Sequence, residues 1–100
     1  MRILLIEDDT VLGAAVRDQI AAGGHSIDWV MRLDAARDAM ASAAYDLVLL
    51  DLMLPDGLGL NFLKALRGRG DVTPVIILTA HGTIDLAVQV EGGHRHTAVM

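Results

Sequence analysis

Short apolar runs alternate with segments of helical periodicity along this chain, and this alternation limits its folds more than any other feature. The apolar runs are too short for helices and are rich in β-branched residues, as in Val75–Leu78, which is typical of buried strands. The segments between them repeat apolar residues every three or four positions, which is typical of amphipathic helices. The alternation therefore predicts a series of βα units.

Four such units are predicted. The predicted strands are Arg2–Ile6, Ser26–Val30, Asp46–Leu50 and Pro74–Thr79, and the predicted helices are Val11–Ala22, Asp34–Ala43, Leu60–Arg67 and Thr83 to about Glu91. A turn is predicted at Pro55-Asp56-Gly57. No Asn-Gly hairpin signal is present, so tandem units favour a parallel sheet with helices on both faces and right-handed crossovers. The predicted fold class is α/β, doubly wound.

Length and composition exclude several classes of protein. The 100 residues allow one domain, and the absence of cysteine excludes disulfides, thiolate nucleophiles and sulfur-ligated zinc. The net charge of -5 gives no general attraction to phosphate backbones, so direct binding to nucleic acid is not expected. The apolar runs are far shorter than the ~20 residues of a membrane-spanning helix. We expect a cytoplasmic protein with no membrane partner.

Acidic residues follow the first and third predicted strands. Glu7 and Asp8 end the first strand, Asp51 ends the third, and Thr79 ends the fourth. Because the carboxyl ends of parallel strands meet at one edge, the three carboxylates are expected to converge there. Such a cluster is costly unless one group is protonated or a cation joins it, and Mg²⁺ prefers oxygen ligands. Asp51 could then act as a nucleophile, with the Thr79 hydroxyl contacting a phosphoryl oxygen.

Each of these residues also has an ordinary structural interpretation. Asp9, and Asp8 taken alone, stand just before a helix, where aspartate caps exposed N–H groups. Asp51 taken alone is equally compatible with a hydrogen-bonded carboxylate at a strand end, and Thr79 with an ordinary strand threonine. The convergence of the three acids on one edge favours the cation site. His25, His94 and His96 show no metal-ligand spacing.

Three motifs resemble the receiver domain of bacterial two-component response regulators. They are Ile3-Leu-Leu-Ile-Glu-Asp-Asp9, Asp46-Leu-Val-Leu-Leu-Asp-Leu-Met-Leu-Pro-Asp-Gly-Leu-Gly59 and Pro74-Val-Ile-Ile-Leu-Thr-Ala80. The resemblance covers residue 1 to about residue 89. It implies a flavodoxin-like three-layer sandwich with five strands, in which Asp51 takes a phosphoryl group from a sensor histidine kinase.

The resemblance also implies a site and an output. Asp8 and Asp51 would bind Mg²⁺ with the backbone carbonyl of Met53, and Glu7 would support them. Thr79 would contact the phosphoryl group and shift when it is present. The domain would be a signalling phospho-acceptor, with only self-catalysed phosphorylation and dephosphorylation, and the full-length protein a transcription regulator. The motif at Leu52–Pro55 resembles winged-helix transcription factors, whereas the segment Thr79–Gln89 resembles enhancer-binding ATPases.

The chain departs from the family pattern after Gln89. The family's site is expected to contain a lysine side chain as a second positive charge beside Mg²⁺. The only lysine of this sequence is Lys64, in the third predicted helix, so that charge is missing from the predicted site. Residues 97–100 predict a short stub of the fifth strand, with Ala98 where the family usually has an aromatic switch residue. No residues remain for a fifth helix, and the apolar surface left uncovered favours self-association.

Three explanations for this departure are a shortened chain, a fragment or frameshift product, and a diverged stand-alone module, and the first two are favoured. The main functional alternative is a pseudo-receiver, an interaction module that works without phosphate. A small flavin-binding domain is a weaker alternative, because acids follow the first strand where phosphate-binding Ser/Thr-rich turns would be needed.

Overall fold

The computed structural model describes the backbone of residues 1–78, 84–88 and 95–99 and the side chains of residues 1–78. The elements are β1 (Arg2–Ile6), α1 (Thr10–Ala22), β2 (Ser26–Val30), α2 (Leu33–Ser42), β3 (Leu47–Asp51), β4 (Met53–Leu54), β5 (Gly57–Leu58), α3 (Gly59–Gly68), β6 (Val75–Leu78), β7 (Ile84–Val88) and β8 (Arg95–Val99). Among the described residues, no helix combines the length and apolarity needed to cross a bilayer.

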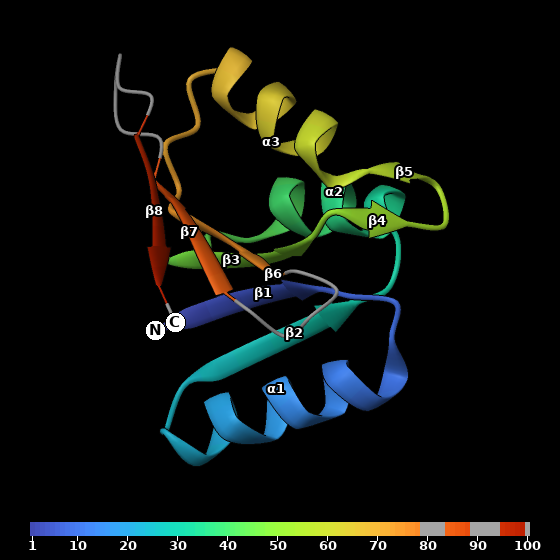
Figure 1. Ribbon diagram of the computed structural model, residues 1–100, viewed down its shortest axis with the longest axis vertical. Coiled ribbons are helices and arrows are strands. Elements are labelled where there is room, and N and C mark those ends of the chain that lie inside the picture. Colours follow the sequence, from blue (N-terminus) through green and yellow to red (C-terminus); the bar gives the residue numbers. More distant parts are fainter. Residues whose placement is uncertain (79–83, 89–94, 100) are drawn as a thin grey trace.

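The main sheet has the strand order β2-β1-β3-β6-β7-β8. The first four of these strands are parallel, as predicted, with β1 between β2 and β3. Helix α1 covers one face of the sheet, and α2 and α3 cover the other (Figure 1). The predicted α/β class and three-layer arrangement are confirmed.

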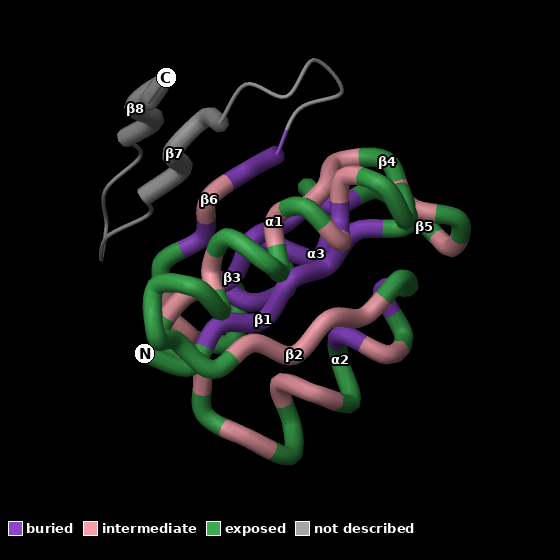
Figure 2. The backbone as a smooth tube through the Cα atoms, turned by 90° about the horizontal axis from the view of Figure 1, so that it is seen from below, coloured by how far each residue is buried: buried purple, intermediate pink, exposed green. Residues whose placement is uncertain are grey.

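Alternate residues of the central strands supply two separate cores. Leu4 and Ile6 of β1 pack with residues of α2 and α3, whereas Ile3 and Leu5 pack with residues of α1. Figure 2 shows the buried residues running along β1 and β3 through the middle of the molecule. A strand that is buried on both faces has apolar residues at successive positions. The continuous apolar runs in the sequence therefore predicted interior parallel strands.

The predicted fourth helix is wrong. Its central residues, Ile84–Val88, form strand β7, which pairs antiparallel with β6. The sequence Ile-Asp-Leu-Ala-Val satisfies a two-residue alternation as well as a helical one, and pairing with β6 satisfies backbone groups that an edge strand would leave open. Thr83 and residues 89–91 of that prediction lie outside the described residues.

The stub of a fifth strand predicted at residues 97–100 overlaps strand β8, which begins at Arg95, and Met100 lies outside the described residues. In the structure β8 pairs antiparallel with β7, which separates it from β6. The described part of the sheet is therefore parallel over four strands and antiparallel over the last two.

The turn predicted at Pro55-Asp56-Gly57 belongs to the hairpin β4–β5, in which Pro55 and Asp56 form the turn and Gly57 begins β5. This hairpin is attached to the start of α2. The residue before α2, Arg32, offers no side-chain cap. Instead, the Asp56 carboxylate accepts hydrogen bonds from Leu33 N at 2.8 Å and Asp34 N at 3.0 Å. The hydrogen bond from Leu33 is the main reason that the pKa of Asp56 is lowered. This contact anchors the segment that follows Asp51.

Candidate functional site

The candidate site lies at the carboxyl ends of β1 and β3, which are neighbours in the sheet (Figure 1). Ile6 pairs with Leu50, so the next residues along each strand, Glu7 and Asp51, leave the sheet side by side. Strand β2 lies on one side of β1 and strand β3 on the other, so the direction in which successive strands are added reverses at β1. Ligands of doubly wound sheets bind at such reversals of strand order.

Three carboxylates converge there, as the sequence predicts. Glu7, Asp8 and Asp51 each place one carboxylate oxygen within 4.8 Å of the others. Glu7 is buried, with 2% of its surface exposed, whereas Asp51 is half-buried and Asp8 is exposed. The cluster opens into a cavity of about 440 Å³ lined also by Asp9, Leu12, Leu52 and Met53. The site is therefore accessible on the Asp8 side and closed behind Glu7.

Backbone hydrogen bonds fix the segment that carries Glu7 and Asp8. Glu7 N donates to Val30 O at 3.0 Å, and the Trp29 indole Nε1 donates to Glu7 O at 2.8 Å. Asp9 N donates to the Glu7 carboxylate at 3.1 Å. The Asp9 carboxylate itself accepts from two N–H groups in the first turn of α1, so its predicted role as a helix cap is confirmed.

The buried carboxyl group of Glu7 is hard to ionise in this setting. Its pKa is raised from 4.5 to about 7, mainly by burial, and the Asp51 and Asp8 carboxylates raise it further. The hydrogen bond from Asp9 N acts in the opposite direction. The cluster therefore has an excess of negative charge near neutral pH, which a divalent cation would offset.

The donor set fits a hard cation such as Mg²⁺. All of its side-chain donors are carboxylate oxygens, and the cavity leaves room for water ligands. Met53 N donates to Asp51 Oδ1 at 3.4 Å, while the Met53 side chain is exposed. The part of Met53 as a carbonyl ligand stays a prediction, and Thr79 lies outside the described residues. Lys64 is exposed on α3.

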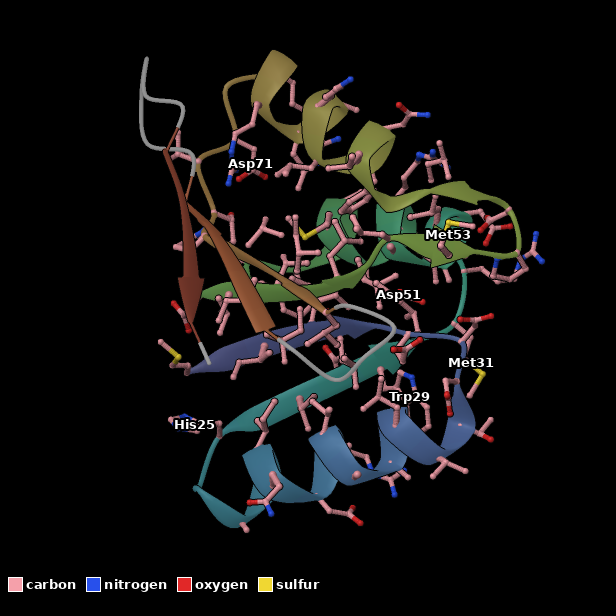
Figure 3. All side chains as sticks on the ribbon, in the orientation of Figure 1. His25, Trp29, Met31, Asp51, Met53 and Asp71 are labelled. Carbon is pink, nitrogen blue, oxygen red and sulfur yellow. The ribbon has the colours of Figure 1, made fainter. Side chains whose placement is uncertain are left out.

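Two residues that contribute to the site were not predicted from the sequence. Trp29 bonds to the backbone of Glu7 and projects toward α1 (Figure 3). Gly59 is buried at the start of α3, where a Cβ would overlap the carbonyl oxygen of Asp51. The sequence shows a single tryptophan in a short predicted strand and a glycine eight residues after Asp51. Neither feature indicates that Trp29 contacts Glu7 or that Gly59 contacts Asp51.

The family model described as the response regulator receiver domain matches residues 3–97. The chain belongs to this family. It is a family of signalling domains, so the predicted family and its two-component context are confirmed. The chain is 44% identical over 88 residues to the swarming motility regulation protein RssB of Serratia marcescens, covering 88% of this chain and 40% of RssB. It is 40% identical over 89 residues to the transcriptional regulatory protein QseB of Escherichia coli O157:H7, covering 89% of this chain and 41% of QseB.

Solved receiver structures share the fold. The MaeR response regulator bound to beryllium trifluoride matches with a TM-score of 0.76 at 34% identity, covering 80% of this chain and 67% of MaeR. The response regulator TrrA from Thermotoga maritima, in complex with Mg²⁺ and beryllium fluoride, matches with a TM-score of 0.74 at 29% identity, covering 79% of this chain and 69% of TrrA. The receiver chain thus spans about 40% of the length of its curated relatives RssB and QseB.

Without a divalent cation, Glu7→Gln is expected to flatten the pH dependence of stability. In the wild type the folded-state pKa of about 7 exceeds the ordinary 4.5, so this group costs nothing below pH 4.5 and progressively destabilises the fold up to pH 7. The full cost is roughly 3 kcal/mol above pH 7. Glutamine keeps an oxygen for Asp9 N and adds no charge. The variant should match the wild type at pH 4 and exceed it at pH 8.

Urea denaturation at a series of pH values, in chelator, measures this difference. Asp38→Asn, which removes an exposed carboxylate on α2, is the control and should run parallel to the wild type. If Glu7→Gln also runs parallel to the wild type, Glu7 does not carry the raised pKa.

Proposed function

We propose that this receiver domain accepts a phosphoryl group on Asp51 from a sensor histidine kinase, with Mg²⁺ bound by Asp8, Asp51 and the backbone carbonyl of Met53 and supported by Glu7. The observation that carries the proposal is the convergence of three carboxylates at the mouth of one cavity. TrrA, which shares the fold of this chain, was solved in complex with Mg²⁺ and beryllium fluoride, and this supports a cation site in this chain as well.

Phosphoryl transfer to Asp51 requires mainly that the protein position the reacting groups and neutralise their charge. An oxygen of the Asp51 carboxylate attacks the phosphorus of a phosphohistidine, a P–O bond forms, the P–N bond breaks, and the imidazole leaves and takes a proton. Asp51 is half-buried and lines the cavity, so its carboxylate is both held and reachable. Mg²⁺, when bound, supplies neutralisation of the charge on the phosphoryl oxygens. Asp8, which is exposed and lines the same cavity, would supply a further carboxylate oxygen to hold the cation.

The output of the full-length protein is proposed from its relatives. QseB is a transcriptional regulatory protein, and RssB regulates swarming motility. We propose that this domain likewise controls transcription through a further module, and that it does so from the cytoplasm without binding nucleic acid itself. Self-association of the domain is part of this proposal.

Incubation with Mg²⁺ and a small acyl phosphate, followed by intact mass measurement, tests the phospho-acceptor function. We expect an adduct of one phosphoryl group in the wild type and in Asp38→Ala, and none in Asp51→Ala. Absence of an adduct from a folded wild type that binds Mg²⁺ would favour the pseudo-receiver. The observation that favours this alternative is that the only lysine of the sequence, Lys64, belongs to helix α3 and does not follow a strand.

Asp8→Ala is expected to weaken Mg²⁺ binding by at least about tenfold, because it removes one of the ligand oxygens of the cluster. Titration calorimetry measures the affinity, and Asp38→Ala controls for the loss of one negative charge. Since Asp8 is exposed, its removal should leave the fold intact. Unchanged affinity would remove Asp8 from the site.

A further inference from the structure

We propose that Trp29 is the positioning residue of the acidic site: its indole N–H fixes the peptide unit between Glu7 and Asp8 and thereby sets the affinity of the site for a divalent cation. The proposal rests on the proposed function, because it concerns the same cation. It assigns a role to a side chain that touches neither the cation nor the phosphoryl group.

The peptide unit in question lies just beyond the end of a strand. The pairing of β1 with β2 ends at Ile6 and Val30, and the final backbone bond is that from Glu7 N to Val30 O. The carbonyl oxygen of Glu7 receives its hydrogen bond from Trp29 Nε1, at 2.8 Å and across 22 residues of sequence. A side chain thus continues the ladder where the backbone stops.

Fixing this carbonyl fixes two of the three acids. The Glu7 carbonyl and the N–H of Asp8 belong to one planar peptide unit, so the orientation of one determines that of the other. The Glu7 side chain leaves one end of this unit and the Asp8 side chain leaves the other. Rotation of the unit would separate two carboxylate oxygens that now lie within 4.8 Å of each other.

The indole ring is itself held in place by α1. Gly13 is buried, and a Cβ at this position would overlap the six-membered ring of Trp29. The guanidinium carbon of Arg17 lies 5.3 Å from the ring centroid, within the range of a cation–π contact. Helix α1 therefore contacts the ring twice, and Figure 3 shows Trp29 between β2 and this helix.

A neutral donor suits this position. The indole N–H can only donate, so it orients the carbonyl without adding charge near the cluster. A lysine or arginine in the same place would compete with a divalent cation for the carboxylates. The alternative interpretation is that Trp29 is a core residue whose N–H merely found a partner, and cation affinity separates the two.

Trp29→Phe tests the proposal because it keeps an aromatic six-membered ring at this position and removes the N–H together with the five-membered ring. Titration calorimetry with MgCl₂ is expected to show affinity weakened by about three- to tenfold, the range for one lost hydrogen bond. Tyr45→Phe is the matched control, since it removes the O–H that donates to Asp28 at 2.6 Å at the opposite end of the sheet. Its Mg²⁺ affinity should stay within about twofold of the wild type.

Gly13→Ala is a second variant, which tests the same role if Trp29→Phe does not fold. Alanine favours a helix over glycine, but the overlap with the Trp29 ring costs stability, so urea denaturation checks that this variant is folded before the titration. The substitution displaces the indole ring and should weaken Mg²⁺ binding as Trp29→Phe does. Wild-type affinity in either folded variant, or equal weakening in Tyr45→Phe, would overturn the role of Trp29. A wild type that binds no Mg²⁺ would overturn the proposed cation site as well.

Discussion

Asp51→Asn is expected to abolish phosphorylation and, without a divalent cation at pH 8, to raise the free energy of unfolding by on the order of 1 kcal/mol or more. Asparagine lacks the carboxylate nucleophile, so no acyl phosphate forms. It also removes one of three negative charges whose oxygens lie within 4.8 Å. The Asp51 carboxylate raises the pKa of Glu7, first through a hydrogen bond with the protonated Glu7 carboxyl group and then through its charge, so ionisation of both groups in the fold is unfavourable.

Two measurements check this pair of effects. Intact mass after treatment with a small acyl phosphate reports the adduct, and urea denaturation in chelator and in Mg²⁺ reports stability. Asp38→Asn removes the same charge from an exposed position on α2 and should change stability little. Mg²⁺ should stabilise the wild type more than Asp51→Asn. Equal or lower stability of Asp51→Asn in chelator would contradict the electrostatic account of the cluster.

Local sequence pattern predicted the first three βα units closely because each signal acts within its own segment. The predicted strand Ser26–Val30 coincides with β2, and the predicted helix Val11–Ala22 begins one residue after α1 does. Asp9 caps that helix through bonds to residues two and three positions away. Periodicity, capping and glycine stops contain enough information to place such elements.

The segment Ile84–Val88 could not be assigned in this way. Its five residues fit both a strand and a helix, and the choice depends on whether β6 has an open edge. That edge is a property of the assembled sheet and cannot be read from the segment itself. The resemblance to receiver domains added to the error, because it favoured a further βα unit at this point.

The acidic cluster could be predicted because parallel strands bring their carboxyl ends to the same edge of the sheet, independently of the loop conformations. The residues that support the cluster could not be predicted in this way. Trp29 bonds to Glu7 across 22 residues, and Asp56 bonds to Leu33 across 23. Each contact joins two segments that are far apart in the sequence, and their proximity follows only from the folded arrangement. The pattern around Asp56 indicates a turn, which is correct, but says nothing of the helix that it caps.

Gly59→Ala is expected to be among the most damaging single methyl additions to this chain, with a loss of about 3 kcal/mol of stability. Gly59 is buried at the first residue of α3, and its N–H donates to Leu52 O at 2.8 Å. A Cβ there would overlap the carbonyl oxygen of Asp51 and contact the Cα of Leu52. Because both neighbours are backbone, no side-chain rotation relieves the overlap. The displaced segment includes Asp51, so Mg²⁺ affinity should fall with stability.

Gly68→Ala, at the other end of the same helix, is the matched control. A Cβ at Gly68 meets nothing within 4 Å, and helix propensity then favours alanine by about 0.5 kcal/mol. Urea denaturation of the two variants should therefore give opposite signs for the same chemical change. If both substitutions raise the free energy of unfolding, the backbone around Asp51 can move away from α3 with little loss of stability. The close approach of α3 would then not hold Asp51 in position.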